Sequence, residues 1–462
     1  MRVQELVEEA LARATGPLVV RVVDRYEANL RWAANALTTN GEMHSRRLSV
    51  TATAEVEGGT AVATVSSDVA EVAEVAPLVA AAESLARTGP PAEEPSPLVE
   101  GADSPGGADH FEADPEVTGV EALTSVAAGL GEAFARARAE ANLLYGFAEH
   151  VVETVYLATS TGVRRRGVQP TGRFELNGKS DDLTRSAWVG QASRTFTDVD
   201  VPALYAELVT RLGWARNSIE LPPGRYETLL PPGAVADLMV YAWWTANARD
   251  AEEGRNVYAA GEGRTRVGER LSPLPLTLLS DPAWPGQETI PFVHEPTSPD
   301  GTSWAFDAGL AVPAVRWVDD GVLTELVRNR GHAAATGQQP TPPADNLVLD
   351  GGGTATLAEM VAGTRRGLLL TCLWYIREVD PERLLLTGLT RDGVYLVEDG
   401  EVVAAVNNFR WNESPVELLG RITEVGASVP TLCREWNDWM NRTVMPPVRI
   451  ADFSMSTVSQ AS

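Results

Sequence analysis

The N-terminal part of the chain changes repeatedly between helical and extended patterns of apolar residues. Residues 3–12 form one apolar face at helical spacing, which predicts a short helix. The apolar runs 18–23 and 29–37 are typical of short strands, and the Asn-Gly pair in segment 38–41 predicts a turn after them. Residues 47–56 alternate strictly, and a Gly-Gly turn leads into residues 60–65. These segments predict an antiparallel meander, which a helix reaching about residue 87 follows.

Further along, the pattern predicts a second group of strands between helices. Residues 88–109 are rich in Pro and Gly, which is typical of an extended surface loop; a linker is favoured over a cover for a cleft. Residues 115–142 are Ala-rich and predict a long helix. Residues 143–160, 162–170 and 172–179 are strand-like, and residues 204–212 predict a helix that closes this half.

The run LPPG at 221–224 is the predicted domain boundary. Residues 1–220 are then an N-terminal α+β domain with an antiparallel sheet, and residues 221–462 are a β-rich C-terminal domain. Within the second domain, two prolines open an apolar stretch that turns polar and ends at Gly254, which predicts one central helix over 233–253. The strand-like segments after residue 366, with a hairpin turn at 398–400, predict mostly antiparallel sheet around this buried helix. The fold class is α+β.

Composition and charge restrict the possible partners. The chain has 462 residues, with 38 basic against 63 acidic side chains and a net charge of −25, so nucleic acid and anionic membranes are not expected to bind it. The two cysteines do not make a disulfide framework, and neither a signal peptide nor a spanning run of about 18 apolar residues is present. We therefore expect a cytoplasmic protein.

The sequence offers little catalytic chemistry. The five histidines, His44, His110, His150, His294 and His332, lack HExxH spacing, and each is expected to be a surface or packing residue. Cys372 lies in an apolar run and is expected to be buried, whereas Cys433, beside Arg434, could be exposed. The triple glycine at 351–353 is a weak signal for a nucleotide site. The predicted central helix is a place where a metallopeptidase could hold histidines, yet residues 231–258 contain no His and no Cys.

Tryptophans are concentrated near the central helix and near the C-terminus. Trp243 and Trp244 lie in the predicted helix, and Trp436 and Trp439 lie close together far along the chain. Each indole can bury about 150–250 Å², so such residues usually belong to a core or an interface. We assign these four residues to peptide binding or to a subunit interface, and we expect them to fill the place of a former metal pocket.

Several segments resemble one known family. NLRWAAN at 29–35 with LTTNG at 37–41 resembles the N-terminal strand pair of the TldD/TldE (PmbA) family. The block 231–258 resembles the central helix of that family, FDAG at 306–309 and DGVL at 320–323 resemble a hairpin region, and LVEDGEVV at 396–403 resembles a late hairpin. The order and spacing of these segments extend the resemblance over nearly the whole chain.

The resemblance implies a non-catalytic subunit. In the catalytic subunit of the family, a HExxxH motif on the central helix and a cysteine near the C-terminus bind zinc. Here the two histidine positions fall near Met239 and Trp244, and the cysteine position falls nearer Asn437 than Cys433. Neither Met239 nor Trp244 offers the N, thiolate or O donors that zinc sites use. The resemblance therefore implies no catalytic residue and no metal in this chain, a TldD-like partner that carries zinc, and a peptide substrate.

Two other hypotheses remain open at this point. The chain could be a homodimeric hydrolase that uses a carboxylate and histidine site, or a regulatory protein without a link to peptidases. A cluster of carboxylates and histidine that meets in space would favour the first of these. Homodimers of the isolated chain are also expected to be possible when the partner is missing.

Overall fold

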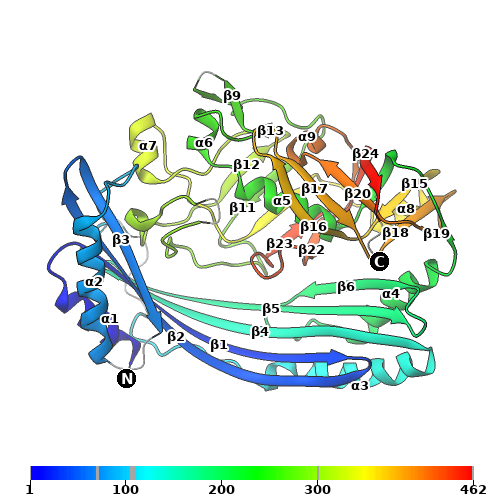
Figure 1. Cartoon of the computed structure of the whole chain (residues 1–462), viewed down its shortest axis with the longest axis horizontal. Helices are drawn as coiled ribbons and strands as arrows, with labels where there is room; N and C mark the ends of the chain where they lie inside the picture. Colours follow the sequence, from blue (N-terminus) through cyan, green and yellow to red (C-terminus); the bar gives the residue numbers. More distant parts are fainter. Residues whose placement is uncertain are drawn as a thin grey trace.

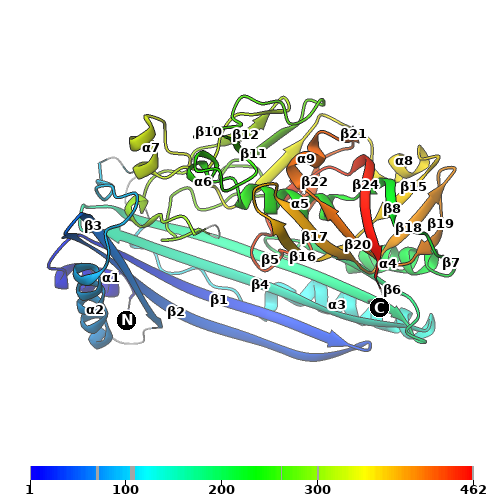
Figure 2. The same ribbon diagram turned by 45° about the horizontal axis from the view of Figure 1, so that its top comes forward.

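The computed structural model describes residues 2–68, 72–102, 104, 110–261, 263–298 and 301–459. Its architecture is α+β, as the sequence predicts, with a long antiparallel sheet formed by the N-terminal half and mostly antiparallel sheets formed by the C-terminal half. Figures 1 and 2 show the N-terminal sheet as one layer, with the C-terminal elements stacked on one of its faces. None of the helices formed by the described residues is long and apolar enough to span a lipid bilayer.

The N-terminal sheet has six antiparallel strands. In spatial order they are β3 (Gly59–Asp68), β2 (Ala36–Val56), β1 (Leu18–Ala33), β4 (Asn142–Thr159), β5 (Arg164–Ser180) and β6 (Ser186–Ala192). One face is apolar and is covered by α1 (Val3–Arg13), α2 (Val75–Thr88), α3 (Thr124–Ala139) and α4 (Val201–Trp214), with the short helices η1 (Val72–Glu74) and η2 (Val120–Leu123). Because side chains alternate along a strand, polar residues such as Arg25 and Glu153 point to the opposite face.

The first hairpin differs from the predicted one. Strand β1 runs without a break, and the turn lies at Ala34 and Asn35, which have φ of 49° and 63°. Two successive positive φ values are typical of a type I′ hairpin turn, whose twist matches the flanking strands. The side chain of Asn35 donates to the carbonyl of Asn142 (2.8 Å) and accepts from the amide of Leu144 (2.7 Å). The predicted turn at 38–41 is therefore wrong, since that segment lies inside β2.

The C-terminal half contains a ten-stranded sheet. Its path runs through β16 (Leu373–Asp380), β17 (Leu385–Thr390), β20 (Phe409–Glu413), β24 (Val448–Val458), β8 (Gly224–Leu230), β15 (Arg366–Leu370), β18 (Val394–Glu398), β19 (Glu401–Val406) and β7 (Ser218–Ile219), and β21 (Ile422–Val425) pairs with β24. Strand β7 lies just before the predicted boundary at residue 221 and joins this sheet through a parallel pair with β19.

Two smaller sheets complete this half. One has the order β13 (Val322–Leu323), β12 (Val315–Asp319), β11 (Thr277–Ser280), β14 (Leu347–Asp350), β23 (Thr443–Met445) and β22 (Val429–Thr431); the other pairs β9 (Ala259–Gly261) with β10 (Arg264–Thr265). The short helices are α6 (Ala248–Glu252), α7 (Arg330–Thr336), α8 (Leu357–Ala362), α9 (Pro415–Leu419) and η3 (Ala305–Asp307).

The central helix α5 (Pro232–Trp244) lies in the largest apolar core of the chain, as predicted for its first turns. The prediction of one helix over 233–253 is wrong, because the helix ends at Trp244 and α6 begins at Ala248. Asn247 caps α6 by accepting from the amide of Asp250 (3.0 Å). The side chain of Asn256 binds the carbonyls of Thr245 (3.0 Å) and Asn247 (2.9 Å), which fixes the break.

Candidate functional site

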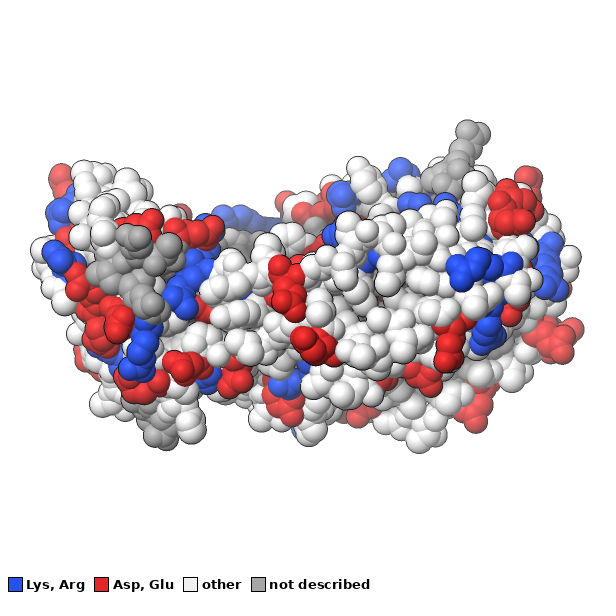
Figure 3. Space-filling model, turned by 90° about the horizontal axis from the view of Figure 1, so that it is seen from below, with Lys and Arg blue, Asp and Glu red and all other residues white. Residues whose placement is uncertain are grey.

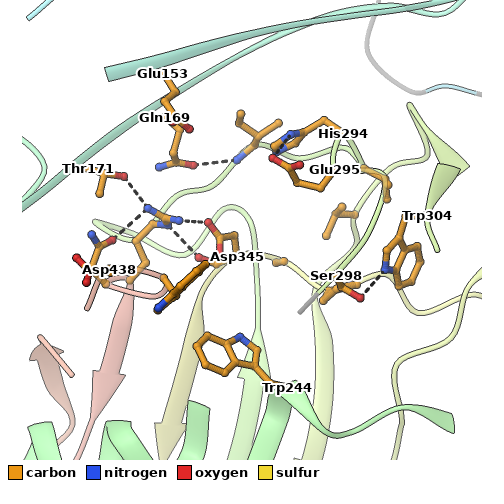
Figure 4. Close-up of a pocket in the computed structure, with 18 of the residues that line it drawn as sticks. Glu153, Gln169, Thr171, Trp244, His294, Glu295, Ser298, Trp304, Asp345 and Asp438 are labelled. Atoms are coloured by element: carbon orange, nitrogen blue, oxygen red, sulfur yellow. Dashed lines mark hydrogen bonds and ion pairs between the residues drawn. The ribbon is translucent and has the colours of Figure 1, made fainter. Parts of the chain in front are cut away.

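A cavity of about 670 Å³ lies between the polar face of the N-terminal sheet and the C-terminal half. Strands β1, β4 and β5 provide its floor, with Arg25, Glu149, Glu153, Gln169 and Thr171. Figure 4 shows Gln169 and Thr171 across the cavity from Trp244. A volume of this size accommodates a ligand as large as a short peptide segment.

The opposite wall is aromatic. It contains Trp243, Trp244 and Trp439 of the four tryptophans assigned from the sequence, and also Trp304 and Phe292. The indole of Trp304 donates to the hydroxyl of Ser298 (3.0 Å), and Trp243 packs against Trp317 in the core (6.3 Å between ring centroids). Trp244 is half-buried, and Trp439 is 71% exposed at the rim of the cavity.

Trp436, the fourth assigned tryptophan, supports this wall from behind. Its ring contacts Trp244 in an edge-to-face arrangement (5.5 Å between centroids, 66°) and Tyr241 at 5.4 Å. Its indole N–H donates to the carbonyl of Asp237 on α5 (2.9 Å), and the amide of Trp439 donates to the carbonyl of Trp436 (2.8 Å). The segment 435–440 is thereby attached to the central helix.

Every Asp, Glu and Arg side chain that lines the cavity has an ionic partner. Arg25 pairs with Glu153 (2.9 Å) and Glu27 (3.1 Å), and Arg442 pairs with Asp345 and donates to the hydroxyl of Thr171 (2.7 Å). The remaining pairs are Arg173 with Glu149 (3.4 Å), Arg173 with Asp438, and Arg21 with Glu295. The charges of the lining are thus largely compensated within the chain.

Burial shifts several of these groups toward their neutral forms. It raises the pKa of Glu149 and of Glu295 and lowers the pKa of Arg442 to about 10, because a charged group loses solvation in an enclosed site. Burial, together with the positive charges of Arg21 and Arg442, lowers the pKa of His294 to about 3. His294 is therefore a neutral imidazole at physiological pH.

The positions that the family resemblance assigns to zinc ligands lie in two environments. Met239 is 2% exposed in the apolar core, whereas Trp244 and Asn437 line the cavity. None of these three side chains is a usual zinc ligand. Among the residues that the structure describes, no three His, Cys, Asp or Glu side chains gather as ligands for one metal ion.

Both cysteines are buried, which confirms the expectation for Cys372 and excludes the exposure that the sequence left open for Cys433. Its thiol donates to the carbonyl of Met440 (2.7 Å), and burial raises its pKa well above the ordinary value. Burial also raises the pKa of Cys372 to about 12. Protonated thiols are poor nucleophiles, so neither cysteine has the environment of a catalytic one.

His44 and His150 make structural contacts within the N-terminal half. His44 and Arg46 flank the buried carboxylate of Asp24 at 2.8 and 2.5 Å. His150 lies within 2.6 Å of the hydroxyl of Thr118 and 2.8 Å of the carbonyl of Arg194.

His332 lies in a second, smaller cavity of about 400 Å³, between Glu94 (3.1 Å) and Glu252 (3.2 Å). This is a cluster of carboxylates and histidine that the sequence spacing does not reveal, because the three residues come from distant segments. Glu94 belongs to the predicted loop 88–109, so part of that loop is attached to the C-terminal half.

Acidic and basic side chains are interspersed on the face of the molecule shown in Figure 3. Nucleic-acid binding requires a continuous basic area on the surface. The basic residues on this face do not form one.

Comparison with known proteins identifies relatives of this fold. The family model described as PmbA/TldA metallopeptidase C-terminal domain matches residues 223–457, which is over half of the chain. TldE from Thermococcus kodakarensis has a similar structure, with a TM-score of 0.77 and 17% sequence identity over 98% of this chain and 99% of that chain.

Two further solved structures are similar, and both are described as putative modulators of DNA gyrase. The one from Thermotoga maritima has a TM-score of 0.74 and 16% identity, over 98% of this chain and 99% of that one. The one from Bacteroides thetaiotaomicron has a TM-score of 0.72 and 15% identity, over 98% of each chain. No curated protein sequence matches the chain.

Proposed function

Because the chain belongs to the PmbA/TldA (TldD/TldE) metallopeptidase family, we propose that it is a TldE-like accessory subunit of a peptidase complex. Its partner is a TldD-like subunit, and the two chains together enclose a chamber in which unfolded or leader peptides are cleaved. The partner supplies the zinc, the water nucleophile and the general base. This chain supplies one wall of the chamber and acts in the cytoplasm.

The observation that carries the proposal is the replacement of metal donors around the central helix. A thioether in the core at Met239, an indole at Trp244 and a carboxamide at Asn437 stand where the family resemblance places the zinc ligands. Zinc sites use imidazole, thiolate or carboxylate groups, so this donor set does not fit the metal. The cavity beside α5 has the volume of a peptide site.

The alternative of a stand-alone hydrolase finds less support in the two histidine sites. An efficient general base has a pKa near the working pH, and burial with two neighbouring arginines lowers the pKa of His294 to about 3. At His332, the two ring nitrogens lie 3.1 Å from Glu94 and 3.2 Å from Glu252, so the imidazole is enclosed between two carboxylates of the chain itself. We interpret the His332 cluster as a structural contact that holds the loop at Glu94 against α6 and α7.

The proposal is tested by measuring zinc content and peptidase activity of the purified chain, alone and mixed with a homologue that carries HExxxH. The expected result is a chain that is metal-free and inactive by itself and that raises the activity of the homologue, with a maximum at a 1:1 ratio. The control mixture contains the homologue with the Glu of its motif changed to Gln, and it should be inactive.

Two results would contradict the proposal in different ways. Stoichiometric zinc or peptide cleavage by this chain alone would favour the stand-alone hydrolase, and H294A and H332A variants would then locate its site. A chain that neither binds the homologue nor changes its activity would favour the regulatory alternative. Analytical ultracentrifugation of the same samples reports whether the isolated chain forms homodimers.

A further inference from the structure

The cavity presents two kinds of surface to a ligand, a polar floor whose charged side chains are paired and a wall of aromatic rings. The charged groups of the floor already have partners, as in the Arg25–Glu153 pair and the Arg442–Asp345 pair. The amide of Gln169 also has partners, because its oxygen accepts from the amide of Ile290 (3.2 Å) and its nitrogen donates to the carbonyl of Glu288 (3.2 Å). A charged ligand would have to exchange existing ion pairs for new ones, which yields little net free energy.

The aromatic wall is different, because two of its rings remain accessible: Trp244 is half-buried and Trp439 is exposed. Trp439 is 71% exposed although its backbone is held by the hydrogen bond to Trp436. The amide of Glu435 donates to the side chain of Asp237 (2.9 Å), and the amide of Met440 donates to the carbonyl of Trp436 (2.8 Å). An exposed indole on a fixed segment is a preorganised contact surface, since little conformational entropy is lost when a ligand covers it.

We infer that this cavity selects apolar, and above all aromatic, side chains of an extended peptide, with Trp244 and Trp439 as the rings that contact them. The inference rests on the proposed function for the peptide nature of the ligand and adds the class of side chain. Trp436 acts as a positioning residue, because it supports Trp244 from behind and does not line the cavity itself. The cavity volume of about 670 Å³ limits the bound segment to a few residues.

Peptide binding by the isolated full-length chain tests the inference. The probes are two fluorescently labelled hexapeptides with capped termini, identical except that two Phe residues in the first are Gln in the second, and the readout is fluorescence anisotropy. The Phe peptide is expected to bind at least tenfold more tightly than the Gln peptide. W439A and W244A are each expected to weaken binding of the Phe peptide about tenfold, or about 1.4 kcal/mol, and to leave the Gln peptide unchanged.

Matched variants separate recognition from folding. L183A removes a similarly exposed apolar side chain far from the cavity, so it should leave both peptides unaffected. W439F and W244F keep an aromatic ring and should retain most of the preference for Phe. Circular dichroism confirms folding, and the aromatic replacements test the site even where W244A loses structure.

Three outcomes would overturn the inference. They are equal affinity for the two peptides, unchanged Phe-peptide binding in both tryptophan variants, and a loss of self-association in W439A without any loss of peptide binding. The last result would assign the rim to a contact between two copies of the chain. Because the binding assay contains no partner, its failure is distinguishable from a failure to stimulate the HExxxH homologue.

Discussion

Asp237 is a carboxyl group enclosed in the core on the central helix, and we predict that it makes stability fall as pH rises. Its side chain is 1% exposed, one oxygen accepts from the amide of Glu435, and the other has no hydrogen-bond partner. Burial raises its pKa well above the ordinary value, and the charge of Glu435 acts in the same direction. The folded chain therefore favours the protonated acid.

The sign of the effect follows from proton linkage. In the unfolded chain the carboxyl ionises near pH 3.9, whereas in the folded chain it keeps its proton to a higher pH. The stability that protonation contributes is complete below the unfolded pKa and is lost as pH rises toward the folded pKa. Over that window the free energy of unfolding falls by up to about 1.4 kcal/mol per pH unit. The D237N variant has a similar shape and no titration, so it lacks this loss.

The assay is urea unfolding followed by tryptophan fluorescence at pH values from about 5.5 to 8.5, above the sequence pI of 4.6. The stability of D237N relative to the wild type is expected to increase with pH until the folded carboxyl ionises. D181N, which removes an exposed carboxylate from a turn, controls for the general effect of one charge. A difference between D237N and the wild type that stays constant over the whole pH range would refute the reasoning.

Three further predictions concern stability in the same urea assay. G146A places a Cβ against the carbonyl of Glu175 and the ring of Trp32 and should cost roughly 1–3 kcal/mol, whereas G41A, with open space around the new Cβ, should change stability by less than about 0.5 kcal/mol. N35A removes two buried hydrogen bonds at the first hairpin and should lower the free energy of unfolding by roughly 2–3 kcal/mol. N35G should lower it by less, because glycine adopts the positive φ of this position without strain. Equal losses of stability in the two variants would contradict the turn geometry. D345A leaves the Arg442 guanidinium without its carboxylate and should cost roughly 1–3 kcal/mol, less than a fully buried pair because Asp345 is half exposed.

The fold class was predictable because apolar periodicity is a local property, but strand length was not. The sequence predicts two short strands where β1 is continuous, since Asp24, Arg25 and Glu27 interrupt the apolar pattern. The structure compensates these charges through neighbouring strands: Asp24 meets His44 and Arg46 on β2, and Arg25 meets Glu153 on β4. Such partners lie far along the chain, so local sequence patterns cannot identify them.

The candidate site, too, was predictable from the sequence only in part. The tryptophans were identified from the sequence because indoles are rare and conspicuous, and three of the four line the cavity. The polar floor was missed because antiparallel pairing assembles it, for example by placing Glu153 opposite Gln169. One signal was available: Gln169, Thr171, Arg173 and Glu175 alternate with apolar residues and glycine along β5, which marks a strand with one polar face.

The floor and the wall of the cavity together restrict what this chain can contribute to a peptidase. Its lining carboxylates and arginines pair with one another, and burial lowers the pKa of its lining histidine to about 3, which makes that imidazole a weak base. The indole at Trp244 replaces a position that the family resemblance assigns to a metal ligand, and Trp436 holds that indole toward the cavity through its bond to α5. Under the proposed function, the same replacement that removes a metal donor supplies a surface for apolar side chains, and binding and catalysis are divided between two related chains.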